Sequence, residues 1–239
     1  MTNKYLLFSC LFLILLIPSN ANAKIDIELS YLSTSTTYNY FSLPNEDETN
    51  RIDINEKKSI NAYRLFIEKH FKNSSYTFLY APLEINYSQV AAKDFKFNQT
   101  NFSKNLTTGI KYVFNSDRLG YRRINQFGRN RWYWGGLIKV RDAEICVSQE
   151  NKSDCYDNVG PVPLLNVGFD LNGDLLYSKV NIDGLFSSKG SAYDANVELG
   201  MNLDIFSIGL GARILGGGAN NEKLINFGQF RSIYVNLTI

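Results

Sequence analysis

The sequence is poor in the residues on which many functions depend. Its 239 residues include one His and three Cys, and 25 Lys and Arg nearly balance 23 Asp and Glu. The resulting net charge of +2 leaves no electrostatic excess for binding nucleic acid. One His and no Cys-x-x-Cys spacing give no recognisable metal site, so we expect no metal and no other cofactor. The hydrophobic fraction of 44% and the aromatic fraction of 14% exclude a disordered chain and favour β-structure.

The N-terminus has the pattern of a secretory signal peptide. Lys4 precedes an almost wholly apolar stretch from Tyr5 to Pro18, and a small-residue cleavage site ends at Ala23. The pattern predicts a signal peptide over residues 1–23, export through the Sec pathway and one mature domain over residues 24–239. An uncleaved membrane anchor is the alternative, but the apolar stretch is short for spanning a bilayer.

Two cysteines remain in the predicted mature chain. Cys10 lies inside the apolar stretch of the signal peptide, which disfavours a lipoprotein signal at this residue. Cys146 and Cys155 are an even number of cysteines in an exported chain, which favours a disulfide. The segment 147–154 between them is rich in polar turn-forming residues. We expect a disulfide that staples a loop, with two free thiols as the alternative.

Alternation of polar and apolar residues dominates the mature chain. No segment approaches the run of about 18 apolar residues that a transmembrane helix needs. Residues 193–203 and 206–214 instead alternate with a period of two, which places successive side chains on opposite faces of a sheet. This pattern predicts an all-β fold of about ten strands. The predicted strands cover residues 24–34, 59–71, 75–88, 110–124, 131–148, 160–170, 175–186, 191–203, 205–216 and 225–239.

The predicted connections alternate between long and short. An up-and-down meander with its long loops at one end is typical of a transmembrane antiparallel β-barrel in the outer membrane of a Gram-negative bacterium. Both chain ends then lie at the periplasmic, short-turn end. The long or polar connections are residues 35–58, 89–109, 149–159, 187–190 and 217–224, and the short ones are 72–74, 125–130, 171–174 and 204.

The aromatic residues of the apolar face decide between a membrane barrel and a soluble one with an apolar interior. They gather at the two ends of the predicted strands with aliphatic residues between them, as expected where a barrel crosses two lipid interfaces. The outer group is Tyr31, Tyr63, Tyr87, Phe186 and Tyr193, and the inner group is Phe71, Tyr121, Trp132, Phe169 and Phe206. The aliphatic residues include Leu65, Ile67, Leu79, Ala81, Leu83, Ile138, Val180, Ile182, Val197 and Leu210.

The polar face of the predicted strands lines the barrel interior, where acids and bases are nearly matched. A barrel of about ten strands is narrow, and buried charges are tolerated only when they are paired or wet. We predict a salt-bridged, mostly occluded lumen. The predicted charge network is Arg64, Glu68, Glu84, Arg118, Arg122, Lys139, Arg141, Asp183, Glu198 and Arg213, and further residues expected in the lumen are Asp26, Glu28, His70, Tyr80, Asp170, Lys179 and Asp194.

Two other hypotheses stay open for the interior and the rim. One is a narrow, porin-like channel for ions or small polar solutes, with Arg118, Arg122, Lys139 and Arg141 as a cationic wall. The other is an enzyme at the outer rim, which needs a base beside a nucleophile or a water. The sequence has no phosphate-binding loop or nucleophile elbow. We therefore expect no enzyme.

The two positions that an enzyme would use have ordinary explanations. His70 falls near the inner end of its predicted strand, where a hydrogen bond to an acid accounts for it. Asp142 and Glu144 lie above the apolar band, where a solvated strand extension accounts for them. No catalytic residue is predicted at either place.

Four stretches of the chain resemble a family of bacterial outer-membrane β-barrel proteins of uncharacterised activity. They are residues 80–83, 139–145, 162–165 and 215–230, and the similarity covers most of the chain from about residue 60. The resemblance implies a fold and a location and supplies no catalytic residue. The family has an aromatic residue at the position of Asp117, and Cys146 and Cys155 are not general in it.

These observations predict a monomer in contact with outer-membrane lipid and lipopolysaccharide. The apolar alternation of the last strand, through Ile233, Val235, Leu237 and Ile239, suits folding by the barrel-assembly machinery. The predicted loops 35–58 and 89–109 are the expected contacts for a host or phage.

Overall fold

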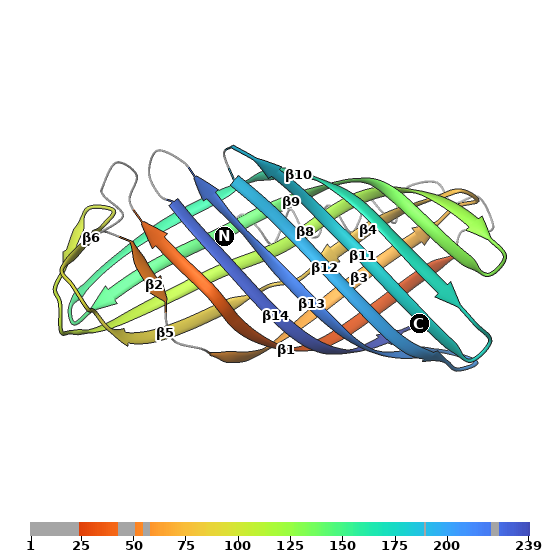
Figure 1. Ribbon diagram of the computed structural model, residues 1–239, viewed down its shortest axis with the longest axis horizontal. Helices are drawn as coiled ribbons and strands as arrows, with labels where there is room; N and C mark the ends of the chain where they lie inside the picture. Colours follow the sequence, from red (N-terminus) through yellow and green to blue (C-terminus); the bar gives the residue numbers. More distant parts are fainter. Residues whose placement is uncertain (1–23, 43–50, 55–57, 189, 221–224) are drawn as a thin grey trace.

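The alternating segments fold as antiparallel strands that close on themselves, as a computed structural model of the chain shows (Figure 1). The structure describes residues 24–42, 51–54, 58–188, 190–220 and 225–239. The predicted signal peptide and parts of the predicted loops 35–58 and 217–224 lie outside the described residues. No helix in the described part of the chain is long and apolar enough to cross a membrane.

Ten strand positions make up the wall of the barrel, as the sequence predicts. Apart from β4 and β5, which both pair with β8, the wall strands pair in chain order, and β14 pairs with β1 to complete the ring. The wall strands are β1 (Ile25–Ser42), β3 (Ser59–His70), β4 (Ser74–Tyr80), β5 (Glu84–Val90), β8 (Thr107–Phe127), β9 (Asn130–Gln149), β10 (Lys152–Asn172), β11 (Leu176–Ser187), β12 (Gly190–Asn202), β13 (Ser207–Asn220) and β14 (Ile225–Thr238). β4 and β5 both pair with β8 and occupy one strand position, because the pairing with β8 is interrupted around Pro82.

One end of the barrel carries additional short strands (Figure 1, left). Three short strands add to it: β2 (Ile52–Ile54) pairs with the end of β1, and β6 (Phe95–Phe97) and β7 (Thr100–Phe102) form a separate hairpin. We call this end, with β2, β5 to β7 and the adjoining ends of β1, β8, β9 and β10, the outer lobe.

The outer lobe has an apolar interior. Rings of the β6–β7 hairpin pack into it, and Phe95 stacks on Phe102 with ring centroids 5.2 Å apart. The buried cluster comprises Phe41, Ile54, Leu83, Ile85, Tyr87, Ala91, Phe95, Phe97, Phe102, Ile110, Tyr112, Phe114, Ile145, Val147, Leu215 and Phe230. The predicted polar loop 89–109 is therefore largely a folded cap over a hydrophobic core.

The prediction of a loop over residues 149–159 is wrong. β9 continues to Gln149 and β10 starts at Lys152, so only a two-residue turn joins them. No side chain of β10 from Lys152 to Gly160 is buried, so the alternation of polar and apolar residues fades there while the backbone ladder continues. Cys146 and Cys155 form the predicted disulfide, but they are directly opposed residues of this hairpin.

The outward face carries the predicted band with one correction. Tyr31, Tyr63 and Phe186 are exposed at its outer limit, and exposed aliphatic residues such as Leu165, Leu210 and Ile233 follow. The exposed aromatic residues Tyr121, Trp132, Phe169 and Phe206 mark the other limit. The residues wrongly assigned to this face are Leu79, Ala81, Leu83 and Tyr87, which are buried. Here the apolar side chains of β4 and β5 turn inward to the apolar cluster or the lumen.

Inward-facing tyrosines lie across glycines of the neighbouring strand. The direct cross-strand pairs are Tyr133–Gly168, Tyr177–Gly200 and Tyr234–Gly211. A Cβ built on Gly211 would lie 2.2 Å from the ring of Tyr234. The missing side chain therefore gives each ring its place in the narrow interior.

This packing predicts that Gly211→Val destabilises the barrel by about 1–3 kcal/mol, because the added side chain must displace a fully buried ring. The shift from folded to unfolded gel mobility on heating, measured as a midpoint temperature, checks it. Gly160→Val is the matched control, since a Cβ on Gly160 has no neighbour within 4 Å. Equal midpoints for the two variants would contradict the packing argument.

Candidate functional site

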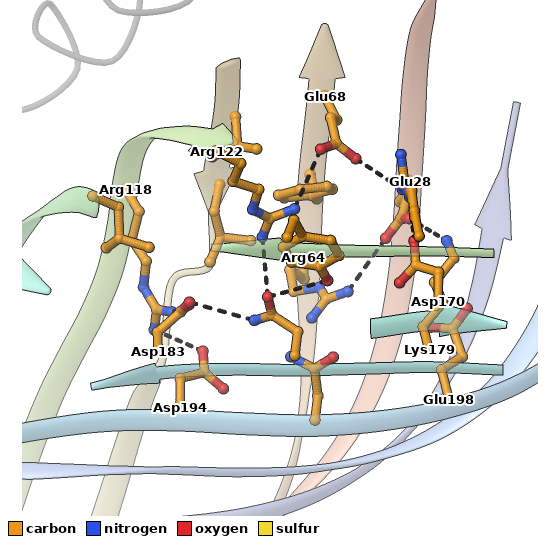
Figure 2. Close-up of a pocket in the computed structure, with 18 residues that line it drawn as sticks. Glu28, Arg64, Glu68, Arg118, Arg122, Asp170, Lys179, Asp183, Asp194 and Glu198 are labelled. Atoms are coloured by element: carbon orange, nitrogen blue, oxygen red, sulfur yellow. Dashed lines mark hydrogen bonds and ion pairs between the residues drawn. The ribbon is translucent and has the colours of Figure 1, made fainter. Parts of the chain in front are cut away.

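A cluster of charged side chains fills the barrel interior at the depth of the apolar band (Figure 2). Six carboxylates face six cations, and every strand of the barrel wall at this depth contributes at least one polar group. We call this cluster the plug. Its charged members are Glu28, Arg64, Glu68, Arg118, Arg122, Arg131, Asp170, Lys179, Asp183, Asp194, Glu198 and Arg213.

Arg118 holds two acids on the far side of the barrel. Its guanidinium pairs with Asp183 and, at 2.6 Å, with Asp194. Asp194 also accepts two bonds from Arg213, at 2.9 and 2.7 Å. All four side chains are at least nine-tenths buried. The group therefore bridges β8 to β11, β12 and β13 across the lumen.

Arg122 occupies the centre of the plug. It donates to Asn166 at 2.7 Å and to Asn181 at 3.1 Å, and it lies 3.4 Å from Glu68. Its guanidinium carbon lies 4.5 Å from the ring centroid of Tyr133. Two neutral amides and an aromatic ring thus complete the coordination of this cation.

Two acids serve more than one base towards the inner end. Glu68 pairs with Arg131 at 3.2 Å as well as with Arg122, and Arg131 also pairs with Asp170 at 2.5 Å. Glu28 pairs with Lys179 at 2.6 Å and with Arg64 at 3.6 Å. Each buried charge in these groups has an opposite charge in reach, which is the condition for its burial.

The plug leaves little free volume. The cavity among its side chains is about 60 Å³, which holds only a few water molecules. The side chains meet from opposite walls in Figure 2, so the interior at this depth is occluded. This arrangement matches a charge network that braces the wall rather than an open pore.

The structure brings most of the predicted network together. Seven of its members lie in the plug: Arg64, Glu68, Arg118, Arg122, Asp183, Glu198 and Arg213. The placement of Glu84 in the lumen is wrong: it is exposed and lies 3.6 Å from Lys111 on the outside. β5 belongs to the outer lobe, whose interior is apolar, so its polar residues face water.

Lys139 and Arg141 lie above the plug. Lys139 is almost fully buried with its Nζ 4.4 Å from the ring centroid of Phe114, and Arg141 donates to Asn158 at 2.8 Å. Arg118 and Arg122 are neutralised by acids instead. The four cations therefore do not form a continuous cationic wall.

Arg131 is the member that sequence reasoning missed. It stands at the first position of a predicted strand, beside Trp132, where the direction of the side chain is hard to assign. Its period-two relation to Tyr133 is a signal that places it inward. Asn166 and Asn181 were missed because an uncharged amide gives no sign in the sequence that it belongs to a charge network.

The residues considered for catalysis are engaged elsewhere. His70 lies 2.8 Å from Asp26 at the inner mouth. Asp142 accepts a bond of 3.0 Å from Asn115, and Glu144 lies 3.5 Å from Lys111. Glu144 is also near Cys146 and Cys155, but a disulfide offers no thiolate to a metal.

No protein-family model and no curated protein sequence match the chain. The resemblance to an uncharacterised barrel family therefore stays a prediction. Similar solved structures include Neisserial surface protein A, at 7% identity over 91% of this chain and 98% of that one with a TM-score of 0.36. Ail of Yersinia pestis has 9% identity over 91% of this chain and 99% of that one, with a TM-score of 0.36.

The transport unit of the autotransporter AIDA-I from Escherichia coli is also similar. Its identity is 7% over 98% of this chain and 97% of that one, with a TM-score of 0.45. These likenesses are remote.

The plug predicts a large cost for losing Asp194. Asp194→Ala leaves two buried guanidiniums short of a partner and is expected to reduce the free energy of unfolding by about 3–5 kcal/mol. Urea unfolding followed by gel mobility measures this loss. Asp174→Ala is the control, because its pair with Arg129 is largely exposed and should contribute at most about 1 kcal/mol. A loss for Asp194→Ala no larger than for the control would show that the plug does not brace the wall.

Proposed function

We propose that the protein is an integral β-barrel of the bacterial outer membrane, closed to solutes by its plug, that carries the outer lobe at the cell surface. The plug is the observation that carries the proposal. Its charges are matched and interlocked, and the free volume among them is about 60 Å³. The function is then structural or surface-interacting.

The outward apolar band supports the membrane position. Along β11, exposed apolar residues run from Leu176 to Phe186, which matches the roughly 9–11 residues of a tilted strand that crosses a bilayer. Aromatic residues mark both limits of the band, as they do at lipid interfaces. The barrel would contact outer-membrane lipid through this band and lipopolysaccharide at its outer rim. Export by the Sec pathway and folding by the barrel-assembly machinery belong to this proposal.

The outer lobe supports a role at the surface. Its apolar core and the β6–β7 hairpin make it a folded body instead of a set of free loops. Asp154 of β10 fixes this hairpin by accepting bonds from Asn98 and Gln99. A rigid lobe binds a partner with little loss of conformational entropy.

The closed lumen predicts that the purified protein gives no conductance steps in a planar bilayer. The charge-balanced variant Arg118→Ser/Asp183→Ser removes two bulky plug side chains and should open a measurable ion path. Arg129→Ser/Asp174→Ser removes an exposed pair and should stay silent. Steps from the unaltered protein would overturn closure and favour the narrow channel. In that case Arg118→Ala and Arg141→Ala should change its ion selectivity.

The orientation is tested separately by tags at opposite ends of the barrel. A tag between Glu150 and Asn151 lies in the outer-lobe turn, and a tag between Gly128 and Arg129 lies in a turn at the other end. Antibody should label the first tag on intact cells and the second only after the outer membrane is permeabilised. The reverse labelling would contradict the proposed orientation, and recovery of the protein in the soluble periplasm would contradict the membrane position.

A further inference from the structure

The barrel wall is interrupted between β10 and β11. These strands pair only from Leu165–Gly184 to Asn172–Tyr177. β10 nevertheless starts at Lys152, and its part above Leu165 pairs with β9 alone among the described strands. One edge of β10 therefore lacks a paired strand along this stretch.

Two prolines mark this open edge. Pro161 and Pro163 are two residues apart, so their nitrogen atoms point to the same side of β10. Pairing with β9 runs through both residues, which leaves that side facing the gap. Proline has no N–H to donate and within sheets is confined to edges and bulges. The sequence itself therefore prevents a full ladder between β10 and β11 here.

The gap lies at the depth of the outer half of the apolar band. Phe169 marks the inner limit of the band on β10, and a membrane-crossing strand has roughly 9–11 residues. Counting from Phe169 places the outer limit near Val159, which is exposed. Pro161 and Pro163 fall within this span, so the opening faces lipid.

A cavity of about 360 Å³ lies behind the gap. Its lining includes Pro161 to Pro163 on one edge of the gap and Leu185 and Ser187 on the other. Apolar side chains of Phe114 and Ala192 contribute to the wall further inside. The cavity lies above the plug and is separate from it.

Two cations, Lys139 and Arg141, line this cavity together with apolar residues and a few uncharged polar ones such as Asn158 and Ser191. Lys139 is 2% exposed and, among the described residues, forms no ion pair; its Nζ lies 4.4 Å from the ring centroid of Phe114. The Nε of Arg141 is buried without a hydrogen-bond partner. Asp194, whose negative charge acts on Lys139, is already paired with Arg118 and Arg213. A buried cation without a carboxylate is costly, and an anionic ligand would offset this cost.

We propose that the cavity binds a single-chain anionic amphiphile, such as a fatty acid, that enters sideways from the outer leaflet through the gap between β10 and β11. Lys139 and Arg141 bind the carboxylate, and the apolar lining and the gap hold the chain. The volume is at the small end of the range for ligand pockets, about 300–1,000 Å³, which suits one acyl chain. The inference rests on the proposed membrane position but not on the closure of the lumen.

Native mass spectrometry of the full-length protein, released from a neutral detergent, tests this with laurate and lauryl alcohol. Laurate should bind at least about tenfold more tightly than the alcohol, because a charge-assisted bond distinguishes them. Lys139→Met keeps the length of the side chain and should reduce this preference several-fold, since Arg141 remains. Lys111→Met is the matched control, since Lys111 is on the outside of the wall, and it should leave the preference intact.

Ala192→Trp tests the cavity itself. Ala192 lines it, so the indole should fill the space and weaken the binding of both ligands. Retained heat-modifiable mobility shows that each variant is folded. If Ala192→Trp does not fold, the Lys139→Met result alone tests the inference. Unchanged laurate binding in Lys139→Met, or equal affinities for laurate and the alcohol, would overturn the inference. Conductance is independent of this outcome, so an open lumen would leave the inference standing.

Discussion

The pairing of charges inside the barrel is the constraint on which the rest of the structure depends. At the depth of the apolar band an ion cannot move out to water, so each carboxylate needs a cation or hydrogen-bond donors from another strand. Glu198, for example, accepts bonds from Tyr177 and Asn236. Asp194 reaches Arg118 of β8 and Arg213 of β13, and Glu68 reaches Arg122 and Arg131. These bonds hold opposite walls at fixed separations. The inward tyrosines then need space at the wall, which glycines of the neighbouring strands provide.

The interior changes character along the barrel axis because the surroundings of the outer face change. In the proposed membrane position the band meets lipid, so apolar residues are needed outside and the polar face of each strand turns inward. Beyond the band the outer face meets water, and the lobe buries apolar residues such as Tyr87 and Phe97 inside, as a soluble domain does. One wall thus carries two opposite patterns. A strand that passes from one region to the other has no single rule for which face is apolar.

This change explains what the sequence could and could not predict. A period of two holds wherever one face of a strand meets lipid. It predicts the ten strand positions of the wall, the outward band and the inward position of residues such as Arg118 and Glu198. The orientation of Leu79 and Tyr87 was assigned wrongly because their strands border the lobe. The hairpin around Glu150 was missed because its β10 half, from Lys152 to Gly160, has no buried side chain and therefore no apolar face. The partners within the plug depend on how ten strands are placed around a ring, and no local pattern carries that information.

A gap in a wall at membrane depth is unstable unless its backbone groups are removed or satisfied, because lipid offers no hydrogen bonds. Pro161 and Pro163 remove two donors from the edge of β10 that faces the gap. The plug blocks the axial route from the inner mouth, and the core of the lobe fills the space beyond the cavity. In the described structure, a ligand can then reach Lys139 through the lateral gap between β10 and β11. The plug and the core of the lobe close the barrel along its axis. A ligand that binds Lys139 must therefore enter from the bilayer.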